Sequence, residues 1–319
     1  MNDMMINFYD LHPPLADLKQ EVLQGLGRQP RRLSPKFFYD RHGSELFEAI
    51  TQTPEYYPTR TELSLLERHA VEMAGLLGRG GLLLELGSGS SRKIRLLLDA
   101  LKPAAYMPVD ISRDYLIESA SELASDFPGV DIHAICADYS TGFELPWIPD
   151  GMPRAAFFPG SSIGNFEPEA ARRLLEHVAR VLGKGGRLLI GVDLHKDPEI
   201  LNAAYNDGQG RTAEFNLNLL SRINRELGAD FDLNMFEHFA YYNAAAGRVE
   251  MHLISCKAQW VEIAGVQFEF ATGERIHTEN SYKYTIEGFH RLAAKAGYEP
   301  VRTWTDERRY FSVHCLRVI

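Results

Sequence analysis

Cysteine is scarce in this sequence, and its few copies have no spacing that points to a disulfide framework or a metal site. The three cysteines, Cys136, Cys256 and Cys315, lie far apart and form neither a CxxC pair nor a Cys/His cluster. Disulfide-rich scaffolds and zinc modules both need closely and regularly spaced ligands. We therefore expect reduced thiols, no metal and a cytoplasmic protein.

Positive charge and long apolar runs are lacking as well. Lys and Arg number 34 against 43 Asp and Glu, which gives a formal net charge of −9, whereas nucleic-acid-binding domains are usually basic. No stretch reaches the roughly 18 apolar residues that a membrane helix needs, and the N-terminus shows no secretory signal pattern. These absences predict neither nucleic acid nor membrane among the partners and favour a small molecule; they leave the oligomeric state open.

What the sequence does contain is a regular alternation of strand-like and helix-like runs from residue 81 to residue 194. The strand-like runs span residues 81–87, 105–111, 130–139, 154–165 and 187–194, and the helix-like runs span residues 92–101, 112–127 and 167–183. Ser112 is the expected N-cap of the second helix. Repeated strand–helix units with short connections predict a parallel sheet covered by helices on both faces.

The C-terminal end adds a second clue. An amphipathic helix within "TIEGFHRLAAKAGY" ends at Gly297, and the runs "EPVRTWT" and "YFSVHCLRV" that follow can pair as an antiparallel hairpin. A doubly wound α/β core closed by such a hairpin is similar to the Rossmann-like class I SAM-dependent methyltransferase fold. We assign residues 61–194 and 285–319 to this SAM-binding domain, and residues 1–60 and 195–284 to a discontinuous substrate-binding domain.

The first strand–helix connection, "ELGSGSSRK", has the composition of a nucleoside-binding turn. Gly87 and Gly89 allow a tight turn and a close approach of the backbone. Asp110 ends the next strand, where a carboxylate can accept hydrogen bonds from ribose hydroxyls. The competing hypothesis is a dinucleotide dehydrogenase, whose G-x-G-x-x-G fingerprint requires glycine where this chain has Arg92.

Three further side chains fit the same pocket. Asp138 and Tyr139 end the third strand, where a carboxylate can bind the amine of adenine and an aromatic ring can stack on the base. Lys93, in the first turn of the helix, can bind a cofactor carboxylate as a point charge. Each of these residues, taken alone, also fits an ordinary surface position.

Several longer motifs together resemble one family. The stretches "FFYDRHGSELFEAITQTPEYYPTR", "LLELGSGSSRK", "FFPGSSIGNFEP", "AAYNDGQGRTAEFN" and "IHTENSYKY" are similar to those of the ergothioneine-pathway L-histidine Nα-methyltransferases. The likeness runs from about residue 30 to the C-terminus. Relatives of this family include enzymes that act on tryptophan-derived amines, so the substrate needs a separate argument.

The resemblance implies a function and a set of site residues. It implies three methyl transfers from S-adenosylmethionine (SAM) to the α-amine of L-histidine, which give the trimethyl betaine hercynine. The donor contacts that it implies are Gly87, Lys93, Asp110, Asp138 and Tyr139, the last often phenylalanine in the family. The substrate contacts that it implies are Tyr56, Gly160, Asn165, Tyr205, Met251, Glu279, Asn280 and Ser281.

Glu279 and Ser281 carry the argument for the substrate. By the resemblance they read the imidazole ring, while Asn165 and Tyr205 hold the carboxylate, Tyr56 helps to fix the imidazole and Met251 forms an apolar wall. A neutral imidazole has one donor and one acceptor nitrogen, so a carboxylate and a hydroxyl suit its two edges. An indole has a donor only, so this pair discriminates against it.

Methyl transfer needs an aligned amine lone pair, and no obligatory base is evident in the sequence. Tyr39, in "FFYDRHG", resembles a family position near the reacting amine, and we assign it a positioning or proton-relay role. His277 is expected to be structural. Three alternatives stay open at this point: an N-methyltransferase of tryptophan or a related amine, an NAD-dependent oxidoreductase, and a ligand-binding protein without catalysis.

Overall fold

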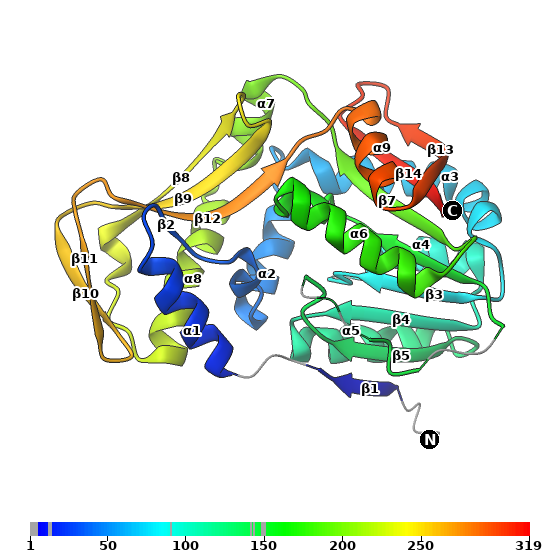
Figure 1. Ribbon diagram of the computed structural model, residues 1–319, viewed down its shortest axis with the longest axis horizontal. Coiled ribbons are helices and arrows are strands. Elements are labelled where there is room, and N and C mark those ends of the chain that lie inside the picture. The colour runs from blue at the N-terminus through cyan, green and yellow to red at the C-terminus, as the bar shows by residue number, and fades with distance from the viewer. Residues whose placement is uncertain (1–5, 12–14, 90, 141, 143, 148–150) are drawn as a thin grey trace. The chain divides into compact units, whose positions relative to one another are not determined.

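The computed structural model describes residues 6–11, 15–89, 91–140, 142, 144–147 and 151–319 (Figure 1). The chain divides into two compact units, each built from separate stretches of sequence. The first unit contains Met1–His12, Pro58–His195 and Tyr282–Ile319, and the second contains Pro13–Tyr57 and Lys196–Ser281. No helix in the described part of the chain is both long enough and apolar enough to cross a membrane.

The first unit is organised around one sheet with the strand order β1-β5-β4-β3-β6-β7-β14-β13. Its strands are β1 (Asn7–Asp10), β3 (Leu82–Leu86), β4 (Ala105–Asp110), β5 (Asp131–Cys136), β6 (Arg154–Phe158), β7 (Arg187–Asp193), β13 (Tyr298–Thr305) and β14 (Phe311–Val318). The strands from β1 to β7 pair in parallel, whereas β14 is antiparallel to both β7 and β13. This is the expected doubly wound core with its C-terminal hairpin.

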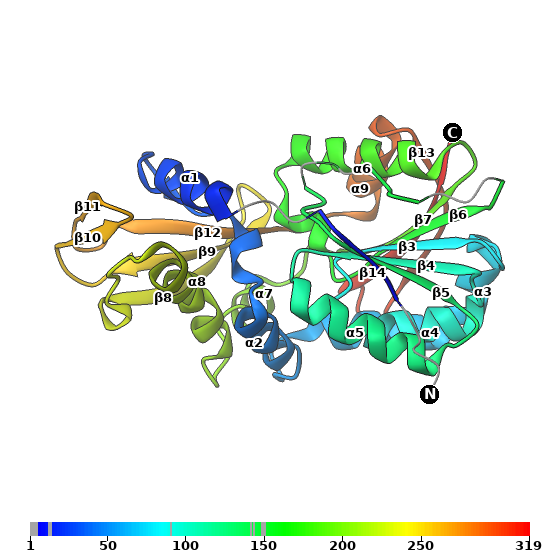
Figure 2. The same cartoon turned by 90° about the horizontal axis from the view of Figure 1, so that it is seen from below.

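Helices cover both faces of this sheet (Figure 2). They are α3 (Tyr57–Leu77), α4 (Arg92–Leu101) and α5 (Arg113–Asp126) on one face, and α6 (Pro168–Leu182) and α9 (Ile286–Lys295) on the other. Each face has its own apolar core, with Leu97 and Phe157 in one and Leu175 and Phe158 in the other. Because both sheet faces are buried, strands such as β3 are apolar at nearly every position.

The structure corrects three details of the sequence analysis. Strand β6 ends at Phe158, and the predicted run to residue 165 continues as the short 3-10 helix η2 (Ser162–Asn165). Ser112 precedes α5, but its side chain makes no capping hydrogen bond. The N-terminal β1 lies within the range 1–60 that we assigned to the substrate-binding domain, yet it pairs with β5 of the first unit.

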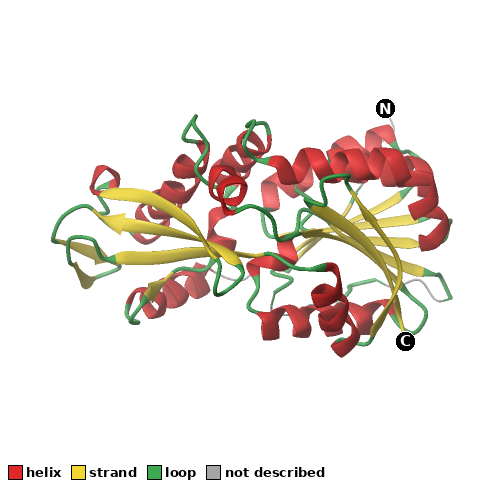
Figure 3. Ribbon diagram, turned by 90° about the horizontal axis from the view of Figure 1, so that it is seen from above, coloured by secondary structure: helices red, strands yellow, loops and turns green. Residues whose placement is uncertain are grey.

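The second unit combines a four-stranded sheet, a hairpin and several helices (Figure 3). The sheet has the order β2-β12-β9-β8, with β2 (Arg31–Arg32), β8 (Phe236–Asn243), β9 (Arg248–Ser255) and β12 (Arg275–Tyr282); the hairpin is β10 (Gln259–Ile263) and β11 (Val266–Phe270). Its helical elements are α1 (Leu15–Leu26), η1 (Pro35–Phe38), α2 (Arg41–Thr51), α7 (Pro198–Ala204), α8 (Arg211–Leu227) and η3 (Leu233–Met235). Helix α8 packs against β8, β9 and α2.

Candidate functional site

The glycine turn after β3 is tight, as its sequence predicts. Gly87 and Gly89 both have positive φ, at 69° and 44°. A Cβ on Gly87 would lie 3.3 Å from the Tyr139 phenol oxygen, so a larger residue would push that ring away. The turn therefore lets the Tyr139 ring approach the backbone closely, and it brings together two of the residues expected at the donor.

Asp110 ends β4 and holds the glycine turn in place. Its Oδ2 accepts a hydrogen bond from the Gly89 amide at 3.1 Å, and its Oδ1 accepts one from the Ser112 amide at 2.9 Å. Burial raises the pKa of the Asp110 carboxyl. Each carboxylate oxygen has two lone pairs, so both oxygens can still accept a ligand hydroxyl. These contacts fit the ribose-binding role that we expected.

Asp138 and Tyr139 follow β5 and line the same region. One oxygen of Asp138 accepts hydrogen bonds from the Ser140 amide at 2.9 Å and the Ser140 hydroxyl at 2.5 Å. The Tyr139 ring packs edge-on against Phe158 with 5.7 Å between ring centroids. Burial raises the pKa of the Tyr139 phenol, so it stays neutral. Tyr139 can therefore offer a fixed apolar ring to a base.

Glu62, on α3, is a central residue of this region that the sequence analysis missed. Its side chain is fully buried, and its Oε2 lies 2.7 Å from Lys93 Nζ. Both its oxygens accept from the Gly160 amide, at 2.9 and 3.1 Å. Lys93 is therefore already paired with a carboxylate and is not an isolated point charge. Because Glu62 lies in a helix outside every motif, no local pattern could have revealed it.

The loop after β6 carries two of the expected substrate contacts. Gly160 and Ser161 both have positive φ, at 77° and 58°, which turns the chain sharply into η2. The Ser161 hydroxyl accepts a hydrogen bond from the Asp193 amide at 2.9 Å. A Cβ on Gly164 would lie 2.7 Å from the Tyr282 carbonyl oxygen. This close packing fixes the turn that ends in Asn165.

In the second unit, five aromatic rings form a chain of contacts. Tyr39 packs edge-on against Phe47 and Phe215, with centroid distances of 5.9 and 5.8 Å. Phe47 contacts Tyr56 at 6.1 Å, and Tyr56 contacts Tyr205 at 6.3 Å. The structure thus brings the three expected tyrosines together. Phe47 and Phe215 were not predicted.

Tyr205 and Ser281 are in direct contact. The Tyr205 hydroxyl donates a hydrogen bond to Ser281 Oγ at 2.7 Å, so the Ser281 proton can point to another acceptor. The Tyr205 carbonyl accepts from His238 Nε2 at 2.9 Å, which anchors the loop after α7 to β8. Glu279 precedes Ser281 by two positions on β12 and is 7% exposed. A nearly buried carboxylate and a hydroxyl therefore share one short stretch of strand.

Asn280 and Met251, the two remaining expected substrate contacts of the second unit, have hydrogen-bond partners other than Tyr205 and Ser281. The Asn280 Oδ1 lies 2.9 Å from His277 Nε2, whereas neighbouring Ser281 bonds with Tyr205. Met251, on β9, is 2% exposed, and its carbonyl accepts from the Thr278 hydroxyl at 3.1 Å. Strand pairing between β9 and β12 therefore places Met251 close to the residues that precede Glu279.

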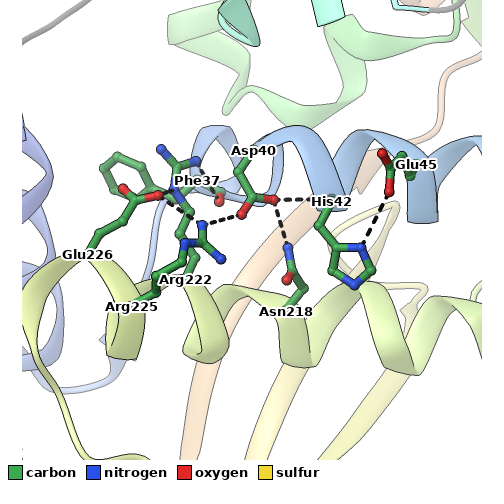
Figure 4. A network of polar contacts seen from close by, with 9 residues as sticks. Phe37, Asp40, His42, Glu45, Asn218, Arg222, Arg225 and Glu226 are labelled. Carbon is green, nitrogen blue, oxygen red and sulfur yellow. Dashed lines mark hydrogen bonds and ion pairs between the residues drawn. The ribbon is translucent and has the colours of Figure 1, made fainter. Parts of the chain in front are cut away.

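A polar network fixes the segment that carries Tyr39 (Figure 4). Asp40 caps α2 by accepting from the Gly43 amide at 2.7 Å, and it also accepts from Asn218 Nδ2 at 2.9 Å and Arg225 Nη2 at 2.5 Å on α8. These bonds lower the pKa of the Asp40 carboxyl in spite of its partial burial. An Asp directly before "RHGSELF" is an N-cap signal that the sequence analysis did not use.

The candidate residues thus fall into two groups. The donor candidates all lie in the first unit, together with Gly160 and Asn165, and the other substrate candidates lie in the second unit: Tyr39, Tyr56, Tyr205, Met251, Glu279, Asn280 and Ser281. The glycine turn, its carboxylates and the aromatic ring of Tyr139 fit a SAM molecule. The individual roles stay predictions.

Comparisons with known proteins agree with this picture. The family described as "Histidine-specific methyltransferase, SAM-dependent" matches residues 18–318. The chain is 42% identical over 295 residues to the histidine N-alpha-methyltransferase of Mycolicibacterium smegmatis, covering 91% of each protein. It is 34% identical to ergothioneine biosynthesis protein 1 of Neurospora crassa, over 88% of this chain and 32% of that protein.

A solved structure supports the fold. A S-adenosylmethionine-dependent methyltransferase from Clostridium acetobutylicum superposes with a TM-score of 0.52 at 11% identity, covering 86% of this chain and 98% of that one. At this identity the likeness concerns the fold alone, which is that of class I SAM-dependent methyltransferases. On the strength of its match over nearly the full length, the chain belongs to the family of histidine-specific, SAM-dependent methyltransferases.

Proposed function

We propose that this enzyme transfers methyl groups from SAM to the α-amino nitrogen of L-histidine, three times, and so forms hercynine for ergothioneine biosynthesis. The observation that carries the substrate assignment is the Tyr205–Ser281 hydrogen bond of 2.7 Å beside the nearly buried Glu279. Family membership supports the reaction, because the family is SAM-dependent. It also removes the nicotinamide-dependent oxidoreductase that the sequence left open.

Glu279 and Ser281 recognise the imidazole in this proposal. The carboxylate accepts from the ring N–H. The Ser281 hydroxyl, which accepts from Tyr205 through one lone pair, donates its proton to the other ring nitrogen, which can only accept. An indole offers no acceptor nitrogen, so it would leave the Ser281 proton without a partner. A site built this way can reject such an analogue by as much as about 10⁴-fold.

In this proposal, residues of the first unit bind SAM. The Asp110 oxygens accept from the ribose hydroxyls, Asp138 accepts from the adenine amine, and Tyr139 packs on the base. Bound SAM supplies an electrophilic methyl group: the amine lone pair forms the new N–C bond as the C–S bond breaks and its electrons remain on the sulfur. Lys93 remains paired with Glu62, so it acts on the donor carboxylate as part of a neutral pair.

The aromatic chain of the second unit suits the changing amine. The α-amino group titrates at about 8 in peptides and higher in a free amino acid, so a proton must leave before the first and each following transfer. The final product is a quaternary ammonium without N–H groups. Tyr39 and Tyr56 can hold this cation through their ring faces by cation–π attraction. Positioning of the amine supplies most of the rate, and well-aligned reactants gain roughly 7–11 kcal/mol.

The direct test is mass spectrometry of L-histidine incubated with the protein and SAM. We expect products with one, two and three added methyl groups, and the trimethyl form should accumulate. Tryptophan offered at the same concentration should remain unmethylated. Methylated tryptophan with unchanged histidine would instead favour an N-methyltransferase of tryptophan or a related amine. Binding of S-adenosylhomocysteine without any methyl transfer would favour a ligand-binding protein without catalysis.

The Glu279→Ala variant tests the recognition of the ring. Loss of the carboxylate should raise the KM for histidine at least about tenfold, because a hydrogen bond to a charged group contributes about 1.5–3 kcal/mol. The KM for SAM should change less than about twofold. Glu262→Ala, an exposed glutamate on β10, is the matched control and should leave both constants unchanged. An equal rise of both constants in Glu279→Ala would contradict the assignment.

Two further features of the protein belong to this proposal. We place the enzyme in the cytoplasm, and the thiols of Cys136, Cys256 and Cys315, which are not joined in disulfides, fit a reducing compartment. Fractionation of the cells that express it would test this location. The substrate is a small molecule, so neither nucleic acid nor membrane has a part in the reaction.

A further inference from the structure

Three side chains on β9 and β12 of the second unit have the spacing of metal ligands. They are Glu250, His252 and His277, and one possible ligand atom from each lies within 4.8 Å of the other two. Among the described residues this is the one group of at least three His, Cys, Asp or Glu side chains with such spacing. The sequence shows no metal motif here, because the two histidines lie on different strands.

The cluster is buried, and one of its nitrogens has no partner. The side chains of Glu250 and His252 are 7% and 10% exposed. Nδ1 of His252 is inaccessible to solvent and makes no hydrogen bond. Burying a polar atom without a partner is unfavourable, so this nitrogen requires an explanation that the methyl-transfer reaction does not supply.

Hydrogen bonds determine which nitrogen of each ring carries the proton. His252 Nε2 lies 3.2 Å from Glu250 Oε2, and the carboxylate can only accept. His277 Nε2 lies 2.9 Å from Asn280 Oδ1, which is also an acceptor. Both rings therefore donate through Nε2. Each keeps a lone pair on Nδ1, and in His252 this atom is buried and makes no hydrogen bond.

Glu250 supplies negative charge beside these rings. It accepts hydrogen bonds from Tyr241 Oη at 2.9 Å, Asn243 Nδ2 at 3.0 Å and Arg248 Nε at 2.8 Å. These donors hold the carboxylate in place, although Arg248 also offsets part of its charge and so limits the affinity for a cation. The ring contact between His252 and His277, with centroids 5.1 Å apart, brings the two imidazoles together.

This arrangement matches a common feature of metal sites. Metal-bound imidazoles usually donate their second ring N–H to a carboxylate or carbonyl oxygen, which orients the ring. Glu250 does this for His252, and Asn280 does it for His277. Two neutral imidazoles beside a carboxylate suit a borderline divalent cation such as Zn²⁺.

We propose that His252 and His277 bind a divalent transition-metal cation of the Zn²⁺ class, with Glu250 as the charge-balancing partner and water as the remaining ligands. The cation would tie β9 to β12, the strand that carries Glu279 and Ser281. None of the residues proposed as its ligands has a role in the methyl-transfer reaction, although Asn280, which orients His277, is also an expected substrate contact.

The test is calorimetric titration of the untagged protein with Zn²⁺ in a buffer free of chelators. We expect one Zn²⁺ ion per chain. His252→Ala and His277→Ala should each weaken binding at least about tenfold, and Glu250→Gln should weaken it by about 10- to 100-fold, as loss of an orienting partner typically does. His42→Ala is the matched control, because His42 also lies 3.6 Å from a glutamate, Glu45, but is exposed. It should bind Zn²⁺ as the unaltered protein does.

A second measurement covers the possibility that the substitutions prevent folding. Co²⁺ added to the unaltered protein should give a visible absorption band that saturates at one equivalent and disappears when Zn²⁺ is added. The proposal is overturned if neither metal binds the unaltered protein, or if His252→Ala and His277→Ala fold and retain its full affinity.

Discussion

At the scale of single residues, the partners of a side chain decide its role more than its type does. Lys93 illustrates this, because its position after the glycine turn suggested a charge available to the donor. In the structure its Nζ lies 2.7 Å from the fully buried Glu62. The pair is also joined to the Gly160 amide through Glu62. Lys93 therefore contributes to stability as well as to any contact with the donor.

We expect Lys93→Met to lower the free energy of unfolding by about 3 kcal/mol, because it leaves the carboxylate of Glu62 buried without its cation. The double variant Glu62→Gln with Lys93→Met should recover part of this loss. Chemical denaturation measures both. Arg92→Met, at the exposed neighbouring position, should change stability by less than about 0.5 kcal/mol. Equal effects at positions 92 and 93 would show that the buried pair contributes nothing.

Glu85 leads to a prediction about pH. It is 1% exposed, accepts a hydrogen bond from Tyr106, and burial raises its carboxyl pKa to about 8 from 4.5. Because the pKa is raised in the folded state, the neutral carboxyl makes its full contribution to the free energy of unfolding below about pH 4.5. Above that pH the unfolded chain loses the proton while the folded protein keeps it, so the contribution falls and is lost as the pH rises through about 8. The loss is about 1.4 kcal/mol per pH unit within that window.

Glu85→Gln does not titrate, so its melting temperature should rise relative to the unaltered protein as the pH increases from about 6 to about 8. Thermal denaturation at several pH values gives this difference. Glu118→Gln, an exposed glutamate on α5, should show a difference that does not vary over the same range. A constant difference for Glu85→Gln would mean that this carboxyl is ionised throughout.

At the scale of elements, the turn from η1 into α2 is defined by close backbone packing as much as by its cap. Asp40 joins this turn to α8 through Asn218 and Arg225 (Figure 4). Gly43, in the first turn of α2, lies against the chain that precedes it: a Cβ there would be 1.7 Å from the Phe38 carbonyl oxygen. Tyr39 lies between these contacts, so its ring position depends on both.

Gly43→Ala should therefore destabilise the protein by about 1–3 kcal/mol, the usual cost of forcing atoms into a packed site. It should also lower kcat, because the Tyr39 backbone must shift. Gly75→Ala is the control, since nothing lies within 4 Å of the added Cβ in α3. It should stabilise the protein by about 0.5–1 kcal/mol. Thermal unfolding and initial rates measure the two effects, and a neutral Gly43→Ala would exclude the close packing described above.

At the scale of the whole molecule, each unit is assembled from stretches that are far apart in the sequence. The first unit resumes at Tyr282 after the long insertion that forms most of the second unit. Just after this return, Lys283 Nζ lies 2.8 Å from Asp193 Oδ2 at the end of β7, and both side chains are 1% exposed. A backbone bridge between Leu194 and Tyr284 continues the contact. The ion pair thus joins the two ends of the insertion.

Lys283→Met should lower the free energy of unfolding by about 3–5 kcal/mol, because it leaves the Asp193 carboxylate buried without its cation. Arg317→Met is the comparison: it removes an exposed ion pair with Glu299 on the same sheet and should cost less than about 1 kcal/mol. Guanidinium denaturation distinguishes the two. Similar small losses in both variants would mean that the buried pair is no stronger than an exposed one.

The sequence by itself determined the order of the elements in the first unit and the residue types at the donor end. Apolar runs of fixed period, the Gly87–Gly89 turn and the strand-ending Asp110 and Asp138 are local features, and local patterns follow from backbone geometry and burial. It also indicated the family, because several long motifs occur together. Strand β1 escaped prediction because it is short and lies at the edge of the sheet.

Only the tertiary structure decided which side chains meet. The contacts of Glu62 with Lys93, of Tyr205 with Ser281, and of His252 with His277 join residues on different elements. No sequence period encodes such distances, because they depend on how helices and strands pack once the chain has folded. The pKa of the Glu85 carboxyl likewise follows from burial, which exists only in the folded molecule.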